Sequence, residues 1–208
     1  MKTKARIIVK NENRRMVFSG VMATLAIILV PLYTLWFGTR QNPMEYTLSM
    51  FANRFDQMIE FFIWSTVTGL LIAYYIFRLY GKVDFRNKKA RHSLILSSIF
   101  LILTALTPAV EEVNALTHKL HFMFAAFFAL FLFLSIYFFS RYLKSIDETV
   151  SRKSSRYLFL VVLGSSLVYL IFGDNAMFEL FFFLSLSVFL IFLNRWIKRL
   201  DTGFKTRN

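Results

Sequence analysis

The side chains that could do chemistry gather in a few short stretches, and residues 107–124, TPAVEEVNALTHKLHFMF, form the richest of them. This stretch holds Glu111, Glu112, His118 and His121 between two long apolar runs. A histidine beside a carboxylate can act as a general base. Two histidines three residues apart share a helix face, and together with a carboxylate they can bind zinc. The stretch therefore supplies His121 and Glu111 as catalytic candidates, and His118 with His121 as metal candidates.

Other ionisable residues stand near the ends of other apolar runs. Asn53, Asp56 and Glu60 follow the spacing i, i+3, i+7. This spacing predicts one polar face on a helix that begins in the loop before residue 57 and continues into the apolar run. Asp174 and Glu179 flank the start of the last apolar run. Glu60 is the third catalytic candidate, as a group that orients His121 or binds a metal.

The remaining candidates are side chains that would bind a ligand rather than react with it. They lie before, between and after the apolar runs, at what the sequence predicts to be one face of a membrane. These binding candidates are Arg54, Asp56, Glu112, His118, Lys119, Asp174 and Glu179.

The elements that must position these residues are apolar helices. The chain has 208 residues, of which 57% are hydrophobic and only 18% charged, and the charged residues lie in clumps. Runs of about 20 apolar residues match the hydrocarbon thickness of a bilayer, and a spanning segment without strand-like alternation must be a helix, so that its backbone groups are bonded internally. We therefore expect an all-α, polytopic transmembrane bundle of six helices. The expected spans are 16–38, 57–79, 93–110, 120–141, 156–173 and 176–196.

The distribution of positive charge predicts the orientation of this bundle. Of the 25 Lys and Arg residues, 22 lie in the N-terminal arm, the C-terminal tail and the connectors after the second and fourth spans. Only Arg40, Arg54 and Lys119 lie on the opposite side. Positively charged loops stay in the cytoplasm, so both termini are predicted to be cytoplasmic. The domains are then a basic arm over 1–15, a six-helix domain over 16–197 and a basic tail over 198–208.

This arrangement also explains the net charge of +13 without any nucleic-acid partner. The sequence indicates a multi-pass plasma-membrane protein, of the kind found in a bacterial inner membrane. The apolar run 16–38 has no small-residue cleavage site at its end, which predicts a retained span rather than a removed signal. With no cysteine, thiolate metal sites and cysteine nucleophiles are excluded, and no cofactor is expected.

Apart from arginines at their predicted cytoplasmic ends, the expected spans contain three side chains that can carry a charge near neutral pH. These are Glu60, His121 and Glu179, each about one turn inside the outer end of its helix. Charged groups in a bilayer are costly and usually face a polar interior, so we expect them to meet in one outward-facing cluster. Such a cluster can be structural, because polar contacts between helices hold membrane bundles together. No charge lies near a midplane, which disfavours an ion-coupled transporter.

Two motifs resemble those of the Frag/DRAM/Sfk-like group of six-helix membrane proteins. The first is the loop YTLSMFANRFDQMIEFFIW. The second is the run formed by Pro108, His121, Ala125, Phe127 and Phe128. Met50 follows Ser49 at a position where that group has glycine. The resemblance implies a role in membrane lipid organisation and trafficking, with Ser49, Arg54 and His121 as the positions of interest.

Together these observations predict an integral membrane protein with an outward-facing polar pocket. The pocket would bind a lipid headgroup or a membrane protein partner. The alternative is a membrane-embedded hydrolase or transferase that acts on a lipid or lipid-linked substrate at the outer leaflet. In that case His121 would be the base, and Glu60 or Glu111 would assist it.

Overall fold

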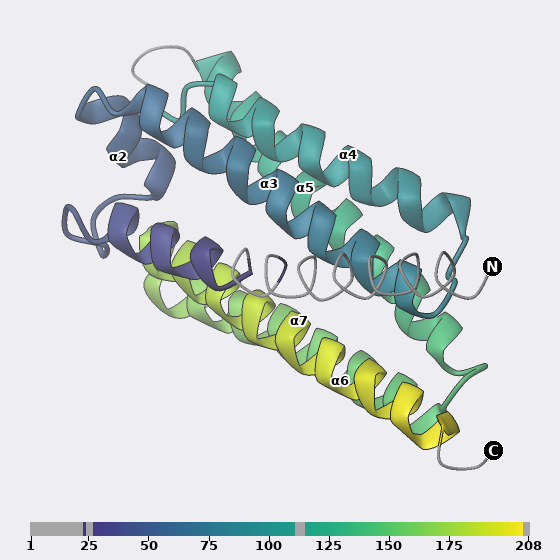
Figure 1. Ribbon diagram of the computed structural model, residues 1–208. Helices are drawn as coiled ribbons and strands as arrows, with labels where there is room; N and C mark the ends of the chain where they lie inside the picture. Colours follow the sequence, from purple (N-terminus) through teal and green to yellow (C-terminus); the bar gives the residue numbers. More distant parts are fainter. Residues whose placement is uncertain (1–22, 24–26, 111–114, 206–208) are drawn as a thin grey trace, which may run out of the picture.

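The chain folds into long antiparallel helices that lie side by side (Figure 1). The computed structural model describes residues 23, 27–110 and 115–205. In this part of the chain every regular element is an α-helix. The helices are Ile27–Gly38, α2 (Leu48–Arg54), α3 (Met58–Lys82), α4 (Lys88–Leu106), α5 (Ala115–Leu143), α6 (Glu148–Phe172) and α7 (Ala176–Lys205).

Five of these helices, α3 to α7, are long and apolar enough to cross a membrane. The predictions of an all-α chain and of multiple apolar spans are therefore confirmed. The helix Ile27–Gly38 is apolar but shorter. The remainder of the predicted first span, apart from Ala23, lies outside the described residues, as does the whole of the arm over 1–15.

Most of the long helices begin several residues before the apolar run that predicted them. The span expected from 156 belongs to a helix that begins at Glu148, and the span expected from 93 belongs to one that begins at Lys88. The reason is local: Asp147 accepts a hydrogen bond from the Val150 N–H at 2.8 Å, and Asn87 caps α4 in the same way. Capped polar turns extend a helix beyond its apolar part, where hydropathy gives no signal.

The two ends of the bundle differ in charge. The α3–α4 connector and the α5–α6 connector lie at one end, and α2 and the α6–α7 turn lie at the other (Figure 1). We call the first the basic end, because it carries the following residues: Arg78, Lys82, Arg86, Lys88, Lys89, Arg91, Arg141, Lys144, Arg152 and Lys153. We call the second the pocket end, for the cavity described below.

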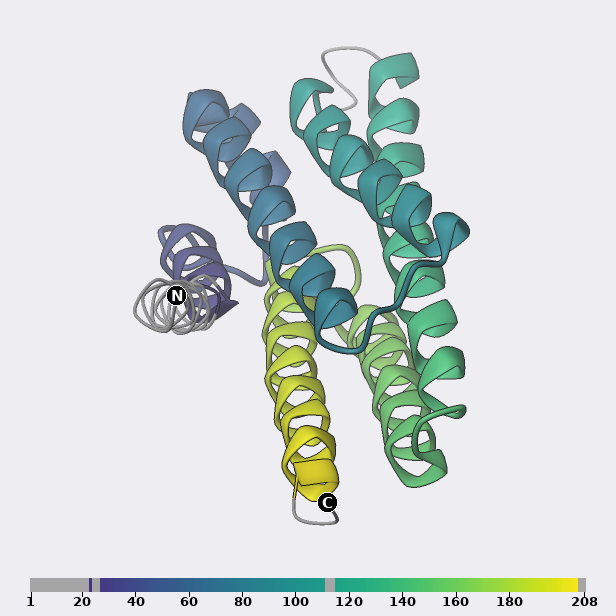
Figure 2. The same ribbon diagram turned by 45° about the vertical axis from the view of Figure 1, so that its right-hand side comes forward.

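Helices α5 and α6 meet at the basic end and separate toward the pocket end (Figures 1 and 2). Small hydroxyl side chains allow the close approach. The hydroxyls of Ser140 and Ser154 are 2.6 Å apart, and the hydroxyl of Ser151 donates to the Ser140 carbonyl at 2.8 Å. Such hydrogen bonds between helices hold membrane bundles together. At the pocket end His121 of α5 contacts the end of α4, and the pocket described below is lined by α5 and α6.

The core of the bundle combines buried aromatic rings with hydrogen bonds between helices. The Tyr80 hydroxyl lies 2.6 Å from the Ser135 hydroxyl, which donates to the Ala90 carbonyl at 2.7 Å, so one chain of contacts joins α3, α5 and α4. The rings of Phe85 and Phe139 pack against Tyr80 at 4.8 Å between centroids. Each of these three polar groups, removed from water, thus has a partner.

The helix predicted to run without a break from the first loop into the second span is interrupted. Helix α2 ends at Arg54 and α3 begins at Met58. Asp56 in the turn between them has φ 55°, a left-handed conformation that Asp adopts more easily than most residues. Asn53 and Glu60 therefore lie on different helices, and the prediction of one continuous polar face is wrong.

Candidate functional site

Segment 44–48 is attached to the start of α7 by hydrogen bonds at the pocket end. The Ala176 N–H donates to the Tyr46 carbonyl at 2.8 Å. The Asn175 side chain accepts from the Met177 N–H at 3.1 Å and so caps α7. Its amide nitrogen donates to the Phe172 carbonyl at 2.7 Å. The bond from Ala176 to Tyr46 holds the segment before α2 against the start of α7.

A pocket of about 520 Å³ lies beneath α2, between α5, α6 and the first turn of α7. Its polar wall combines ionisable groups with hydroxyl groups. The polar residues of the lining are Thr47, Ser49, His121, Ser166, Tyr169, Asp174 and Glu179. A volume of this size is typical of sites for small molecules.

The floor of the pocket is formed by three alanines on one helix. Ala125, Ala126 and Ala129 of α5 line the pocket in a helix that is otherwise rich in phenylalanine. Their side chains end at Cβ, so they leave free volume that leucine or phenylalanine would fill. A second cavity of about 100 Å³ shares Ala125, Ala129 and Glu179 with the first. It continues the space toward α3 and α4 between aromatic side chains.

Glu179 links the pocket to α2. Its Oε2 atom accepts a hydrogen bond from the Leu48 N–H at 2.6 Å. Leu48 is the first residue of α2, where backbone N–H groups have no partner within the helix and favour a negative charge. The Thr47 hydroxyl caps the same turn, because it accepts from the Met50 N–H at 3.0 Å and lies 3.0 Å from the Ser49 hydroxyl. The polar wall is thus held by the start of α2.

His121 joins α5 to the end of α4. Its ring is only 5% exposed. The Nδ1 atom lies 2.9 Å from the Thr104 carbonyl oxygen and 3.0 Å from the Thr107 carbonyl oxygen. Because both neighbours are acceptors, Nδ1 must carry the proton. In the neutral ring Nε2 is then the nitrogen with a free lone pair, which is the tautomer that a general base requires.

Asp174 follows Gly173, whose φ of 78° ends α6 in a turn that favours glycine. Burial raises the pKa of the Asp174 carboxyl above its ordinary value, and the nearby imidazole of His118 lowers it by a smaller amount. The His118 ring packs edge-on against Phe122 at 4.9 Å between centroids. Among the described residues the Nε2 atom of His118 has no hydrogen-bond partner.

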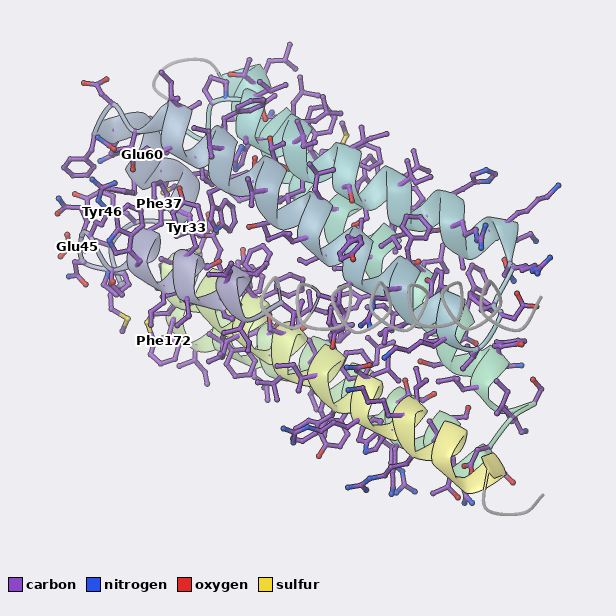
Figure 3. All side chains as sticks on the ribbon, in the orientation of Figure 1. Tyr33, Phe37, Glu45, Tyr46, Glu60 and Phe172 are labelled. Atoms are coloured by element: carbon purple, nitrogen blue, oxygen red, sulfur yellow. The ribbon has the colours of Figure 1, made fainter. Side chains whose placement is uncertain are left out.

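Glu60 does not line this pocket. It forms an ion pair with Arg40, whose guanidinium lies 5.0 Å from the centroid of the Trp36 ring. Figure 3 shows Glu60 and Phe172 at the same end of the bundle but on opposite sides in that view. The expected cluster of three spans therefore contains His121 and Glu179 but not Glu60, because Arg40 compensates the Glu60 charge at the surface.

The other predicted residues are distributed as follows. Arg54 stacks on the Tyr46 ring at 5.9 Å, and Asp56 and Lys119 are exposed. Glu111 and Glu112 lie outside the described residues. In the described part of the chain no group of three His, Cys, Asp or Glu residues could hold a metal ion, so His118 and His121 have no third ligand there.

Sequence reasoning did not assign Thr47 or the alanine floor to the site. Signals for both exist. A threonine directly before an apolar helix predicts an N-cap, and three alanines within five consecutive positions of a phenylalanine-rich span indicate free volume. Ser49 was singled out only by the family resemblance, and it lines the pocket together with His121.

Comparison of the chain with family models, with curated proteins and with solved structures gave no significant match. The helices and the pocket therefore define the class of the protein by themselves. It has the pattern of a multi-pass helical membrane protein with a cavity at one end of the bundle.

Proposed function

We propose that the chain is a membrane protein whose pocket binds the headgroup of a membrane lipid, with the pocket end facing the outside of the cell. The observation that carries this proposal is the composition of the pocket wall. Ionisable and hydroxyl groups line the cavity together with alanine and aromatic side chains. This combination matches a molecule with a polar head and an apolar chain.

The surroundings of the pocket support a ligand that comes from the bilayer. Phe122, Tyr169 and Leu170 line the pocket and are exposed, Leu170 by 76%. Exposed apolar side chains on a spanning helix face acyl chains. A lipid can therefore enter between α5 and α6 without leaving the membrane. A protein partner would need a protruding segment to fill the same cavity, and the lipid is the simpler ligand.

Native mass spectrometry of the gently purified protein tests this proposal. We expect one lipid per chain to remain bound. Ala129→Trp fills the floor of the pocket and should remove the bound lipid. Leu130→Trp is the matched control, because Leu130 neighbours Ala129 on α5 but is 56% exposed. Equal retention of lipid by both variants would contradict the proposal.

A second candidate function is hydrolysis or transfer on a bound lipid. One observation favours it: the hydrogen bonds at Nδ1 of His121 fix the tautomer that a base needs. A water deprotonated at Nε2 could attack an ester carbonyl of the lipid and release the alcohol after proton return. Purified protein in vesicles should then convert lipid with time, and His121→Ala should not. A lipid that stays intact over hours indicates binding alone.

A further inference from the structure

The charge of the pocket restricts which headgroup it can bind. Among the described residues of the lining, Asp174 and Glu179 carry carboxyl groups, and none is a lysine or arginine. His121 is the remaining ionisable group apart from Tyr169. Its Nδ1 proton is already shared with two carbonyl oxygens. A headgroup that placed a phosphate between these two carboxyl groups would find no lysine or arginine in the described lining to compensate its charge.

The same groups suit a donor of several hydrogen bonds. A primary ammonium group has three N–H donors and no acceptor. The wall offers it carboxyl oxygens of Asp174 and Glu179 and the hydroxyl oxygen of Ser49. One Glu179 oxygen already accepts from the Leu48 N–H, which fixes the position of this carboxyl group. Charge-assisted hydrogen bonds of this kind are the stronger ones in proteins.

On the basis of the function proposed above, we infer that the ligand of this pocket is a lipid whose headgroup ends in a primary ammonium, as in an ethanolamine lipid. The ammonium lies between Asp174 and Glu179, and an acyl chain lies along the alanine floor of α5. The raised pKa of Asp174 agrees with this assignment, because a buried carboxyl group without a full counter-charge is the group that an ammonium would stabilise. Choline lipids fit less well, since their quaternary ammonium has no N–H donor.

The experiment compares three lipids with identical dioleoyl chains. The purified, delipidated protein is titrated with the ethanolamine, choline and glycerol phospholipids, and binding is followed by native mass spectrometry and by thermal shift. We expect the ethanolamine lipid to bind the most tightly. Asp174→Asn should weaken its binding about tenfold, the size expected for the loss of one charge-assisted hydrogen bond, and should leave the glycerol lipid unaffected or slightly favoured.

Two results would overturn the inference, and they differ in whether the proposed lipid-binding function is also overturned. Preferential binding of the glycerol lipid, lost in Ala129→Trp, would overturn the ammonium assignment but leave the lipid pocket in place. Binding of all three lipids at equal strength to the wild type and to Ala129→Trp would remove both the inference and the proposed function. Free ethanolamine is added as a separate probe. Stabilisation by it at the same concentration as the lipid would assign the pocket to a soluble amine instead.

Discussion

At the scale of single residues, His121 has two roles: it lines the pocket, and it holds the start of α5 against the end of α4. His121→Ala removes the donor that serves the Thr104 and Thr107 carbonyl oxygens. The Thr107 carbonyl oxygen lies beyond the last turn of α4, so no N–H group of that helix replaces the lost histidine donor. We expect a decrease of about 1–3 kcal/mol in the free energy of unfolding, the usual cost of a buried polar group without a partner.

His121→Asn is the control for this prediction. The asparagine amide can replace the Nδ1–H donor, so the thermal midpoint should fall between those of wild type and His121→Ala. The measurement is thermal unfolding of the three purified proteins in the same detergent. A His121→Ala protein as stable as the wild type would show that the two hydrogen bonds contribute nothing, and the general-base reading of His121 would lose its structural support.

Asp174 predicts a pH dependence of stability. Because burial raises its pKa in the folded protein, the folded state binds the proton more tightly than the unfolded chain, whose value is about 3.9. Ionisation therefore costs folding free energy. This cost is absent below the unfolded value and grows as the pH rises through the folded pKa. Asp174→Asn should be more stable than wild type at pH 7, and the difference should vanish near pH 3.5.

The measurement is the thermal midpoint of both proteins over this pH range, in detergent without added lipid. Asp56→Asn is the matched control. It removes one negative charge at the same end of the bundle from an exposed turn. A wild-type protein that is more stable than Asp174→Asn at neutral pH would reverse the predicted sign and place a cation beside Asp174 in the free protein.

The sequence predicted some site residues and not others for identifiable reasons. His121 and Glu179 could be selected because an ionisable residue in an apolar span must face a polar interior. The same rule selected Glu60, which instead faces Arg40. The rule places a charge away from lipid but does not say which neighbour compensates it. The position of Glu60 relative to α2 depends on the left-handed turn at Asp56. No spacing pattern in the sequence predicted that turn.

At the scale of elements, the contact between Gly38 and Leu48 determines how closely the helix Ile27–Gly38 approaches α2. A Cβ atom at Gly38 would lie 2.8 Å from Leu48 Cδ2 and 3.3 Å from Leu180 Cδ2. Leu48 is fully buried, so it cannot move without displacing its neighbours. Gly38→Ala should therefore lower the free energy of unfolding by about 1–3 kcal/mol, as overpacking generally does.

Gly81→Ala tests whether this effect belongs to the contact and not to glycine as such. A Cβ atom at Gly81 would have nothing within 4 Å, and alanine is the better helix former by up to about 1 kcal/mol. We expect Gly81→Ala to equal or exceed the wild type in thermal midpoint, and Gly38→Ala to fall below both. Equal midpoints for the two variants would contradict the packing at Leu48.

The length of each apolar run predicted that a helix is present, but it did not predict the residues at which the helix begins and ends. Each of the runs assigned to α3 through α7 proved to be a helix, because a run of that length in lipid has no other way to bond its backbone. The ends depend on capping by Asn87, Asp147 and Asn175. Each of these capping contacts involves residues two or three positions apart. Hydropathy is averaged over a longer stretch and gives no signal for them.

At the scale of the whole molecule, the pocket exists because two helices diverge. Helices α5 and α6 meet through Ser140, Ser151 and Ser154 at the basic end and separate toward the other end (Figure 2). There residues at the start of α2 line the pocket. No single segment of the sequence encodes this cavity. The sequence could predict that polar residues would share one end of the bundle, but the angle between α5 and α6 depends on packing across the whole bundle.

The orientation of the bundle is the last prediction, and the chain is well suited to its test because it contains no cysteine. A single introduced cysteine is then the only site that a maleimide can label. Gln41→Cys places it in an exposed position at the pocket end, and Lys144→Cys places it in an exposed position at the basic end. Because basic connectors remain in the cytoplasm, a maleimide that cannot cross membranes should label position 41 in intact cells. Position 144 should react only after permeabilisation. Labelling of position 144 in intact cells would invert the topology and turn the pocket toward the cytoplasm, where the ligand would have to come from the inner leaflet.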